Sequence, residues 1–475
     1  MKYIKIIFFL FSCSAFSQAI TRIEPENFQN IALFGSNLSF NDSEIAVFGI
    51  NTPVTSNNQK LFLFQHSGST VTPNGILECP ESGSVFVGDI EMMDEYLFVG
   101  SISNSTQLVN AGAVFIFKKV DQQWTYLSKL LPPVLQNNGL FGGVIKWHDN
   151  QLFVFSGGYD EAGNPNVNNG AIYVFNHNGD DFNFSQLITG PQNENALGAY
   201  MQFESDTMVT LSENNATTNV HRFEKNNGQW QLVHSQNFGH TGQNYWISVG
   251  FHNNLLIVHR PLDFNSESPA RFDMLQWNTT QNVWTFTQQS IYPAGDYINY
   301  GIAVENGHLF VIAYGEYILQ LERKRTVQHY TFVNNQWIDT GNFYSGFGTW
   351  ADDDFGTLTK IKNGKVGFGN ASEIWGSPFS TTNGGAYFLN FQLSTPETTK
   401  EILTLYPNPT NGVVYVNESQ GQIKEVFLYE STGKQILNKV VNPQTIDLSQ
   451  FPSGLYFCTL VLEDGTQHHQ KIIKK

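Results

Sequence analysis

Carboxylates that could hold a cation stand close together at two places in the sequence. Asp160 and Glu161 lie in a Gly/Asn-rich stretch, and Asp352-Asp353-Asp354 form a run of three. A calcium ion takes about six or more oxygen ligands, several of them charged, and neither group supplies so many. We therefore predict no cofactor and interpret both groups as solvated turns. Calcium is the one ion left to test.

Motifs for nucleophilic, zinc or phosphate chemistry are missing from the sequence. There is no Gly-x-Ser-x-Gly, no His-Glu-x-x-His and no phosphate-binding loop. His259-Arg260, followed by Asp263, is interpreted as a surface loop. A pair of glycosidase carboxylates far apart in the sequence leaves no motif. We expect a non-catalytic binding role, and a polysaccharide-active enzyme remains the alternative.

Aromatic residues in four long polar loops are the candidates for ligand contact. The loops follow the second strand of their repeats, and variable loops on a rigid scaffold commonly carry function. We predict a glycan or an extracellular protein as ligand. The four loops are Ser101–Asn110, Gly157–Asn169, Arg260–Ala270 and Asn370–Asn383, and the predicted ligand-binding residues are Tyr159, Asp160, Glu161, Trp375 and Phe379.

A repeated pattern must position these loops. Its clearest copy runs from Leu140 to Phe175: a Phe-Gly marker, a short strand, a polar turn, a second strand, a Gly/Asn loop and a third strand. Marker glycines recur in roughly 50-residue steps about seven times, which is typical of propellers. The better copies hold four strand candidates, the content of one propeller blade. We predict an all-β chain with an about seven-bladed β-propeller of four-stranded blades.

Four tryptophans recur in one local context. Trp124, Trp230, Trp284 and Trp337 each follow a polar turn, in QQWTYL, GQWQLV, NVWTFT and NQWIDT. A recurring position in a repeat indicates a structural role, so these rings are predicted to pack at a blade edge.

Charge and the N-terminal segment narrow the class of protein. The net charge of −16 argues against binding of nucleic acid. Residues 1–17 combine a positive start, an apolar run and a small-residue cleavage site, which is typical of a signal peptide. The apolar run is too short to span a bilayer. We expect no transmembrane segment in the mature chain, and a propeller over residues 18–393.

The character of the sequence changes after a polar linker, residues 394–401. Three blocks follow in residues 402–475: YPNPTNG, a VFLYESTGKQIL hairpin, and LSQFPSGLY. Short alternating strands with strong turn signals predict a small antiparallel β-sandwich. The motif residues are Tyr406, Pro407, Asn408, Pro409, Gly412, Gly433, Gly454 and Tyr456.

Two resemblances add to this interpretation. The Phe-Gly markers and the strand–loop–strand order of the middle region resemble the FG-GAP repeats of integrin-like propellers. The three C-terminal blocks closely resemble the type A C-terminal sorting domain of the type IX, or Por, secretion system of Bacteroidetes. That resemblance implies the type IX secretion machinery as partner and location outside the cell or on the outer-membrane surface. A structural surface-layer component is a third alternative for the propeller.

Overall fold

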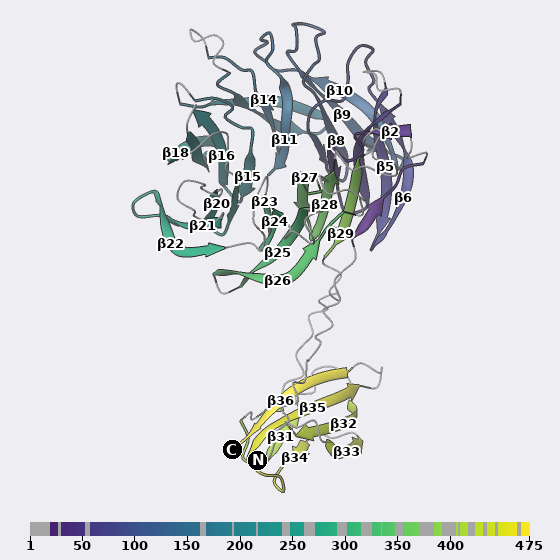
Figure 1. Ribbon diagram of the computed structural model, residues 1–475, viewed down its shortest axis with the longest axis vertical. Coiled ribbons are helices and arrows are strands. Elements are labelled where there is room, and N and C mark those ends of the chain that lie inside the picture. Colours follow the sequence, from purple (N-terminus) through teal and green to yellow (C-terminus); the bar gives the residue numbers. More distant parts are fainter. Residues whose placement is uncertain are drawn as a thin grey trace, which may run out of the picture. The chain divides into compact units, whose positions relative to one another are not determined.

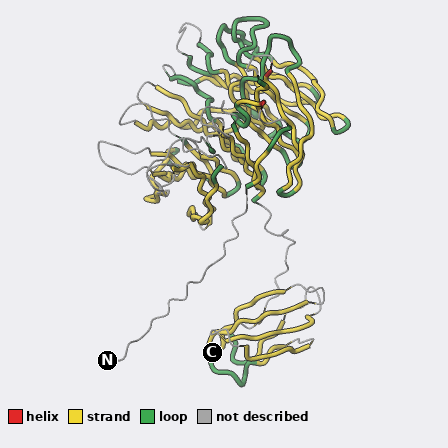
Figure 2. The backbone as a smooth tube through the Cα atoms, turned by 45° about the vertical axis from the view of Figure 1, so that its right-hand side comes forward, coloured by secondary structure: helices red, strands yellow, loops and turns green. Residues whose placement is uncertain are grey.

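The computed structural model divides the chain into two compact units, residues 1–392 and 393–475. Strands make up nearly all of the regular structure in both units (Figure 2). The structure describes residues 20–26, 30–52, 58–161, 168–191, 194–214, 217–239, 248–260, 271–291, 302–314, 325–333, 335–346, 355–356, 358–370 and 384–391 of the first unit, and 405–406, 409–416, 423–430, 435–441, 445–462 and 467–475 of the second.

The first unit is a seven-bladed β-propeller, which confirms the predicted fold class. Innermost strands such as β11 (Phe141–His148) and β15 (Met201–Glu204) lie near its centre in Figure 1, and outermost strands such as β6 (Thr70–Glu78) and β18 (Gln229–Gly239) lie toward its rim.

The blades follow one another along the chain, each from its innermost to its outermost strand. The first blade has β2 (Ile31–Ala32) and β3 (Leu38–Phe40) beside β4 (Glu44–Asn51), then β5 (Gln59–Ser67) and β6 (Thr70–Glu78). The second and third are β7 (Ile90–Met92), β8 (Tyr96–Ser101), β9 (Ala113–Val120), β10 (Gln123–Leu130), and β11 (Phe141–His148), β12 (Gln151–Ser156), β13 (Ala171–Asn178), β14 (Asp181–Thr189). The fourth and fifth are β15 (Met201–Glu204), β16 (Thr207–Asn214), β17 (Thr217–Asn226), β18 (Gln229–Gly239), and β19 (Val249–His252), β20 (Leu255–Arg260), β21 (Arg271–Asn278), β22 (Val283–Ile291). The sixth is β23 (Ile302–Glu305), β24 (His308–Tyr314), β25 (Arg325–Val333), β26 (Gln336–Tyr344).

The seventh blade is completed by the beginning of the chain. It contains β27 (Leu358–Lys362), β28 (Lys365–Asn370) and β29 (Gly385–Asn390), and its outermost strand is β1 (Thr21–Ile23). β1 pairs with β29 antiparallel, Thr21 opposite Phe388 and Ile23 opposite Ala386. This pairing of the first strand with the last blade closes the ring, so every blade packs against a neighbour on both of its faces.

The core of the propeller is divided into seven hydrophobic clusters, one between each pair of neighbouring blades. β13 shows why its sequence, AIYVF, is apolar throughout. Tyr173 and Phe175 pack toward the second blade, and Ile172 and Val174 pack toward the fourth. Side chains of a strand alternate between its two faces, and here both faces are buried.

The recurring tryptophans and the Phe-Gly markers both serve this packing. Trp124, Trp230, Trp284 and Trp337 are between 2 and 8% exposed and lie in the clusters between blades, which confirms their predicted structural role. At the marker, Phe141 is fully buried and Gly142 has φ +101°, where a side chain would lie 2.8 Å from the Ala113 carbonyl oxygen. Glycine is therefore required where the innermost strand begins.

The second unit contains two small antiparallel sheets. One has β30 (Leu405–Tyr406), β31 (Val413–Val416) and β34 (Thr445–Asp447), and the other has β33 (Gln435–Val441), β32 (Ile423–Glu430), β35 (Gly454–Leu462) and β36 (Gln467–Lys474). Their buried residues form one cluster that includes Val414, Leu428, Tyr456, Cys458 and Ile472. This agrees with the predicted second antiparallel fold.

Candidate functional site

Five polar residues end the innermost strands of the third to seventh blades. Each stands immediately before the turn into the second strand and pairs with the first residue of that strand. In four of these turns both residues have positive φ, as in Asn306-Gly307 and Asn363-Gly364. That geometry is typical of the two-residue turns that Asn and Gly favour. We call the five residues the channel ring: His148, Glu204, His252, Glu305 and Lys362.

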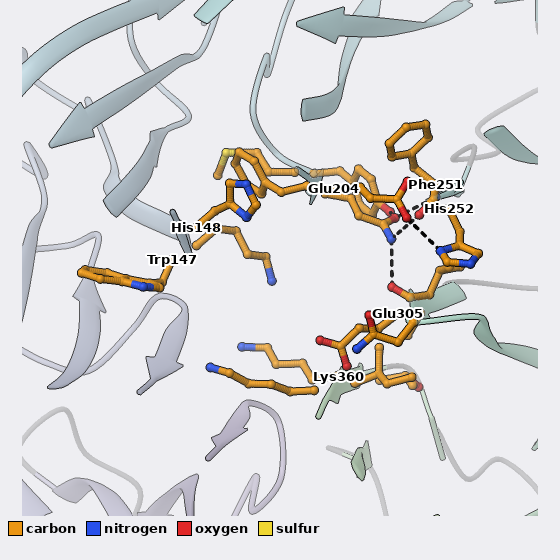
Figure 3. A pocket seen from close by; sticks show the side chains of 18 of the residues that line it. Trp147, His148, Glu204, Phe251, His252, Glu305 and Lys360 are labelled. Carbon is orange, nitrogen blue, oxygen red and sulfur yellow. Dashed lines mark hydrogen bonds and ion pairs between the residues drawn. The ribbon is translucent and has the colours of Figure 1, made fainter. Parts of the chain in front are cut away.

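The alternation of the innermost strands explains why the channel ring faces the propeller axis. In β11, Ile145 and Trp147 belong to the cluster between the second and third blades, so Lys146 and His148 point to the other side. The same alternation places Gln202 with Glu204, and Lys360 with Lys362. These side chains surround a cavity of about 520 Å³ to which the innermost strand of every blade contributes. Figure 3 shows Trp147, His148, Glu204, His252, Glu305 and Lys360 around its open centre.

Side chains of one blade bond to the backbone of the next around this channel. Gln202 accepts from the Phe251 amide at 2.9 Å and donates to the carbonyl oxygens of Phe251 and Val304, both at 2.8 Å. Glu204 accepts from the Asn253 amide at 2.6 Å, and its other oxygen lies 3.0 Å from Nδ1 of His252. These contacts join the fourth, fifth and sixth blades.

Two lysines of the seventh blade reach across the channel to the second blade. Lys360 Nζ lies 2.7 Å from Asp89 Oδ1 and donates to the Ile90 carbonyl oxygen. The other Asp89 oxygen accepts from the Ile145 amide at 3.0 Å. Lys362 Nζ lies 3.3 Å from Glu91 Oε1 and donates to the Met92 carbonyl oxygen at 2.6 Å.

The two glutamates of the channel ring differ in their electrostatics. Burial acts to raise the pKa of Glu204, but the hydrogen bond and charge of His252, with the amides of the following turn, bring that pKa below its ordinary value. The pKa of Glu305 is raised, chiefly by burial and also by the like charge of Glu91, more than Lys362 and the Asn363 amide offset. Its Oε2 atom is buried and has no hydrogen-bond partner among the described residues.

The sequence-predicted ligand residues lie elsewhere. The antiparallel order puts the loops after the second strands at the opposite end of each blade from the tight turns. Tyr159 is 9% exposed and packs on Tyr173, with ring centroids 6.3 Å apart. Asp160 accepts from the Asn168 amide, and Glu161 donates its amide to Asn169. None of the three lines the channel, and their part in binding stays a prediction.

Several of the predicted sites fall outside the described residues. These are Trp375, Phe379, the acidic run 352–354, the signal peptide 1–17, the linker 394–401, and Pro407, Asn408 and Gly433 of the C-terminal blocks. Among the described residues, no group of three or more His, Cys, Asp or Glu side chains could hold a metal ion. In the same part of the chain, no helix is long and apolar enough to cross a membrane.

In the second unit, the last strand joins the first and third sequence blocks. Thr410 of YPNPTNG donates its amide to the Ile473 carbonyl oxygen and accepts from the Lys475 amide, at 2.8 and 2.9 Å. Lys474 is 9% exposed and donates through Nζ to the carbonyl oxygens of Ser449 and Phe451, in the LSQFPSGLY block. The blocks recognised in the sequence are therefore contiguous in the fold.

Two further motif residues have local structural roles. Tyr456 donates its hydroxyl to the Pro452 carbonyl oxygen at 2.5 Å and is buried in the core. At Gly412 a side chain would lie 2.7 Å from Ser449 Oγ, so a larger residue would push this turn away. Of the remaining motif positions, Pro409 and Gly454 are exposed and Tyr406 lies on β30.

Residues 404–475 match the family model described as "Secretion system C-terminal sorting domain". This match identifies the C-terminal unit as a sorting domain and supports the chain as cargo of the type IX secretion system. The sorting domain implies an interaction with that system and export to the cell surface or beyond. No curated protein sequence matches the chain.

Three solved structures are similar to this chain at low sequence identity and low TM-score. A protein from Lactobacillus plantarum is 11% identical with TM-score 0.43, over 85% of this chain and 98% of that one. A putative 6-phosphogluconolactonase from Bacteroides uniformis is 9% identical with TM-score 0.42, over 66% and 85%. PorZ of Porphyromonas gingivalis, a surface component of the type IX secretion system, is 10% identical with TM-score 0.23, over 93% and 75%. None of these likenesses assigns a function to the channel.

Proposed function

We propose that this exported protein is a binding module that holds the end of a glycan in its central channel without transforming it. The cavity of about 520 Å³ is within the size range of small-molecule sites, about 300–1,000 Å³. Most of its charged groups already have partners within the protein, as Glu204 has His252 and Lys360 has Asp89. These pairs fix the shape and the charge of the channel wall.

The observation that carries the proposal is the unpartnered Glu305 oxygen. A buried polar atom without a hydrogen bond costs about 1–3 kcal/mol, and a ligand hydroxyl that donates to Oε2 would remove that cost. Sugars present several such donors. We therefore propose the channel axis, instead of the loops around Tyr159, as the binding site.

A glycan array probed with the full chain tests this proposal. We expect saturable binding that Glu305→Ala weakens by about tenfold and that Tyr159→Ala leaves unchanged. Binding that Tyr159→Ala removes and Glu305→Ala does not would move the site to the loops. Absence of binding to any glycan would contradict the proposal.

A polysaccharide-active enzyme is the second candidate, because one observation favours it. Glu204 and Glu305 face the same channel with pKa values moved in opposite directions, the arrangement of a carboxylate and a general acid. Release of reducing ends or unsaturated products from polysaccharides, lost in Glu305→Gln, would identify this activity. Binding with no product after prolonged incubation would favour the binding module.

A further inference from the structure

Asymmetry in the channel indicates which ligand it fits. The lysines of the seventh blade are bonded to the second blade, and Glu204 is bonded to His252. Two charged side chains of the lining have no such pairing within the described part of the chain. They are Lys146 on β11 and Glu305, through its Oε2 atom, on β23.

Glu305 is an acceptor that needs a donor. Its neighbour in the channel ring is Lys362, but that ammonium is held by Glu91 and the Met92 carbonyl oxygen. Glu305 therefore has no cation of its own to bind, and one of its oxygens remains available to a ligand hydroxyl.

Lys146 is a donor that needs an acceptor. It is half-buried two residues before His148, on the same side of β11. Its charge acts on Asp89 and Lys360, and these two are already paired with each other. An anionic ligand group would give Lys146 a partner without breaking that pair.

The lining of the cavity also includes flat apolar surface. The His148 ring stacks on Phe203, with centroids 4.8 Å apart and planes at 16°, and both line the cavity with Trp147. Aromatic planes beside polar groups suit the mixed apolar and polar faces of a sugar ring.

We propose that the channel selects an acidic sugar, a uronic acid whose carboxylate binds Lys146 while a ring hydroxyl donates to Glu305. This inference rests on the proposed function and names its ligand class. A neutral sugar satisfies Glu305 alone, so the preference for the acid resides in Lys146.

Titration calorimetry of the full chain with galacturonate, galactose and galactosamine separates these contributions. Galacturonate carries a carboxylate at C6 where galactose has a hydroxymethyl group, and galactosamine carries an ammonium at C2 where galactose has a hydroxyl. We expect galacturonate to bind at least about tenfold more tightly than galactose, the effect of one charged hydrogen bond. Lys146→Met should remove this preference and leave the galactose affinity unchanged. Glu305→Gln should weaken both sugars by a similar factor. Lys118→Met, a surface lysine paired with Asp180, is the matched control and should change nothing.

Different results overturn different claims. Equal affinity for galacturonate and galactose, unaltered by Lys146→Met, overturns the acidic ligand and leaves the proposed function intact. Tighter binding of galactosamine also overturns it, because Glu305 would then select a cation. Failure of galacturonate to bind overturns the acidic ligand, whereas the proposed function is overturned by the glycan array, when no glycan binds. Tryptophan fluorescence checks the fold of each variant, since all nine tryptophans precede residue 393.

Discussion

Glu204 and Glu305 occupy the same position in two blades and have different surroundings. Each ends an innermost strand before a two-residue turn, and each is stabilised by the turn amide of the next blade. In the fifth blade the following ring residue is His252, which turns to Glu204. In the seventh it is Lys362, which turns instead to Glu91. The surroundings of each glutamate therefore depend on whether the next residue of the channel ring binds it or binds another group.

Removing Asp89, the carboxylate that binds Lys360 of the seventh blade, should reduce the stability of the protein the most. Asp89→Ala leaves the largely buried Lys360 without its carboxylate, and we expect the free energy of unfolding to fall by about 3–5 kcal/mol. Urea unfolding followed by tryptophan fluorescence measures this. Asp94→Ala, an exposed change in the turn after β7, is the control and should be nearly neutral. Equal losses in the two variants would contradict a structural role for Asp89.

The ionisation of Asp89 also predicts how the propeller responds to acid. Burial acts to raise its pKa, but the charges of Lys360 and Lys146 and the Ile145 amide bring it below the ordinary value. The stabilisation is complete above the unfolded value, about 3.9, and is lost as the pH falls through the lower folded pKa. Asp89→Asn should therefore make the free energy of unfolding depend less on pH in the acidic range. An unchanged pH dependence would contradict this.

Removing the hydrogen bonds of Gln202, in the fourth blade, should reduce the stability of the protein less. Gln202→Leu removes the partner of one backbone amide and two carbonyl oxygens, and we expect a loss of about 1–3 kcal/mol. Gln123→Leu, an exposed change on β10, is the control in the same urea experiment. A loss no larger than that of the control would show that water replaces Gln202.

Neutralising Glu305 should stabilise the protein slightly. Because the folded pKa is raised, ionisation opposes folding once the pH exceeds the unfolded value, about 4.3. Glu305→Gln should raise the free energy of unfolding at pH 7 by about 1 kcal/mol and have no such effect below about pH 4. Destabilisation at pH 7 would mean that Oε2 of Glu305 has a partner in addition to the Asn363 amide that the carboxylate already binds.

The most direct test of the comparison gives Glu305 the kind of neighbour that Glu204 has, a histidine. Lys362→His should let the seventh blade bind Glu305 as His252 binds Glu204, which moves the pKa of Glu305 downward, and the loss of the Lys362–Glu91 pair should lower stability. Carbon-13 NMR of the glutamate carboxyls follows this titration. A pKa that stays raised would show that the backbone, and not the ring partner, separates the two glutamates.

Local sequence predicted the propeller because each blade repeats its own signals. Phe141-Gly142 marks the start of an innermost strand through a buried ring and a positive φ, and both requirements are visible in one copy. The closure by β1 was not predicted. Thr21–Ile23 has three residues, and its partner Ala386–Phe388 lies at the other end of the propeller sequence. A pairing of this kind leaves no local signal.

The sequence motifs considered above did not identify the channel ring. In the Leu140–Phe175 copy the polar turn consists of Asp149 and Asn150, and His148 ends β11 just before it. The usable signal was a titratable residue before each two-residue turn, in WHDN, FESD, FHNN, VENG and IKNG. Even so, the sequence could not show that Lys362 binds Glu91 across the channel. That contact depends on where β7 places Glu91 in the folded propeller.

The pairing of β1 with β29 also sets how the propeller bears mechanical load. The segment before Thr21 and the segment after Phe388 leave the ladder at the same end, since the strands are antiparallel and these residues are opposite each other. A force between the N-terminal segment and the chain that continues to the sorting domain would separate Thr21 from Phe388 first, then Arg22 from Tyr387, then Ile23 from Ala386. The ring would open in an unzipping geometry, one residue pair at a time.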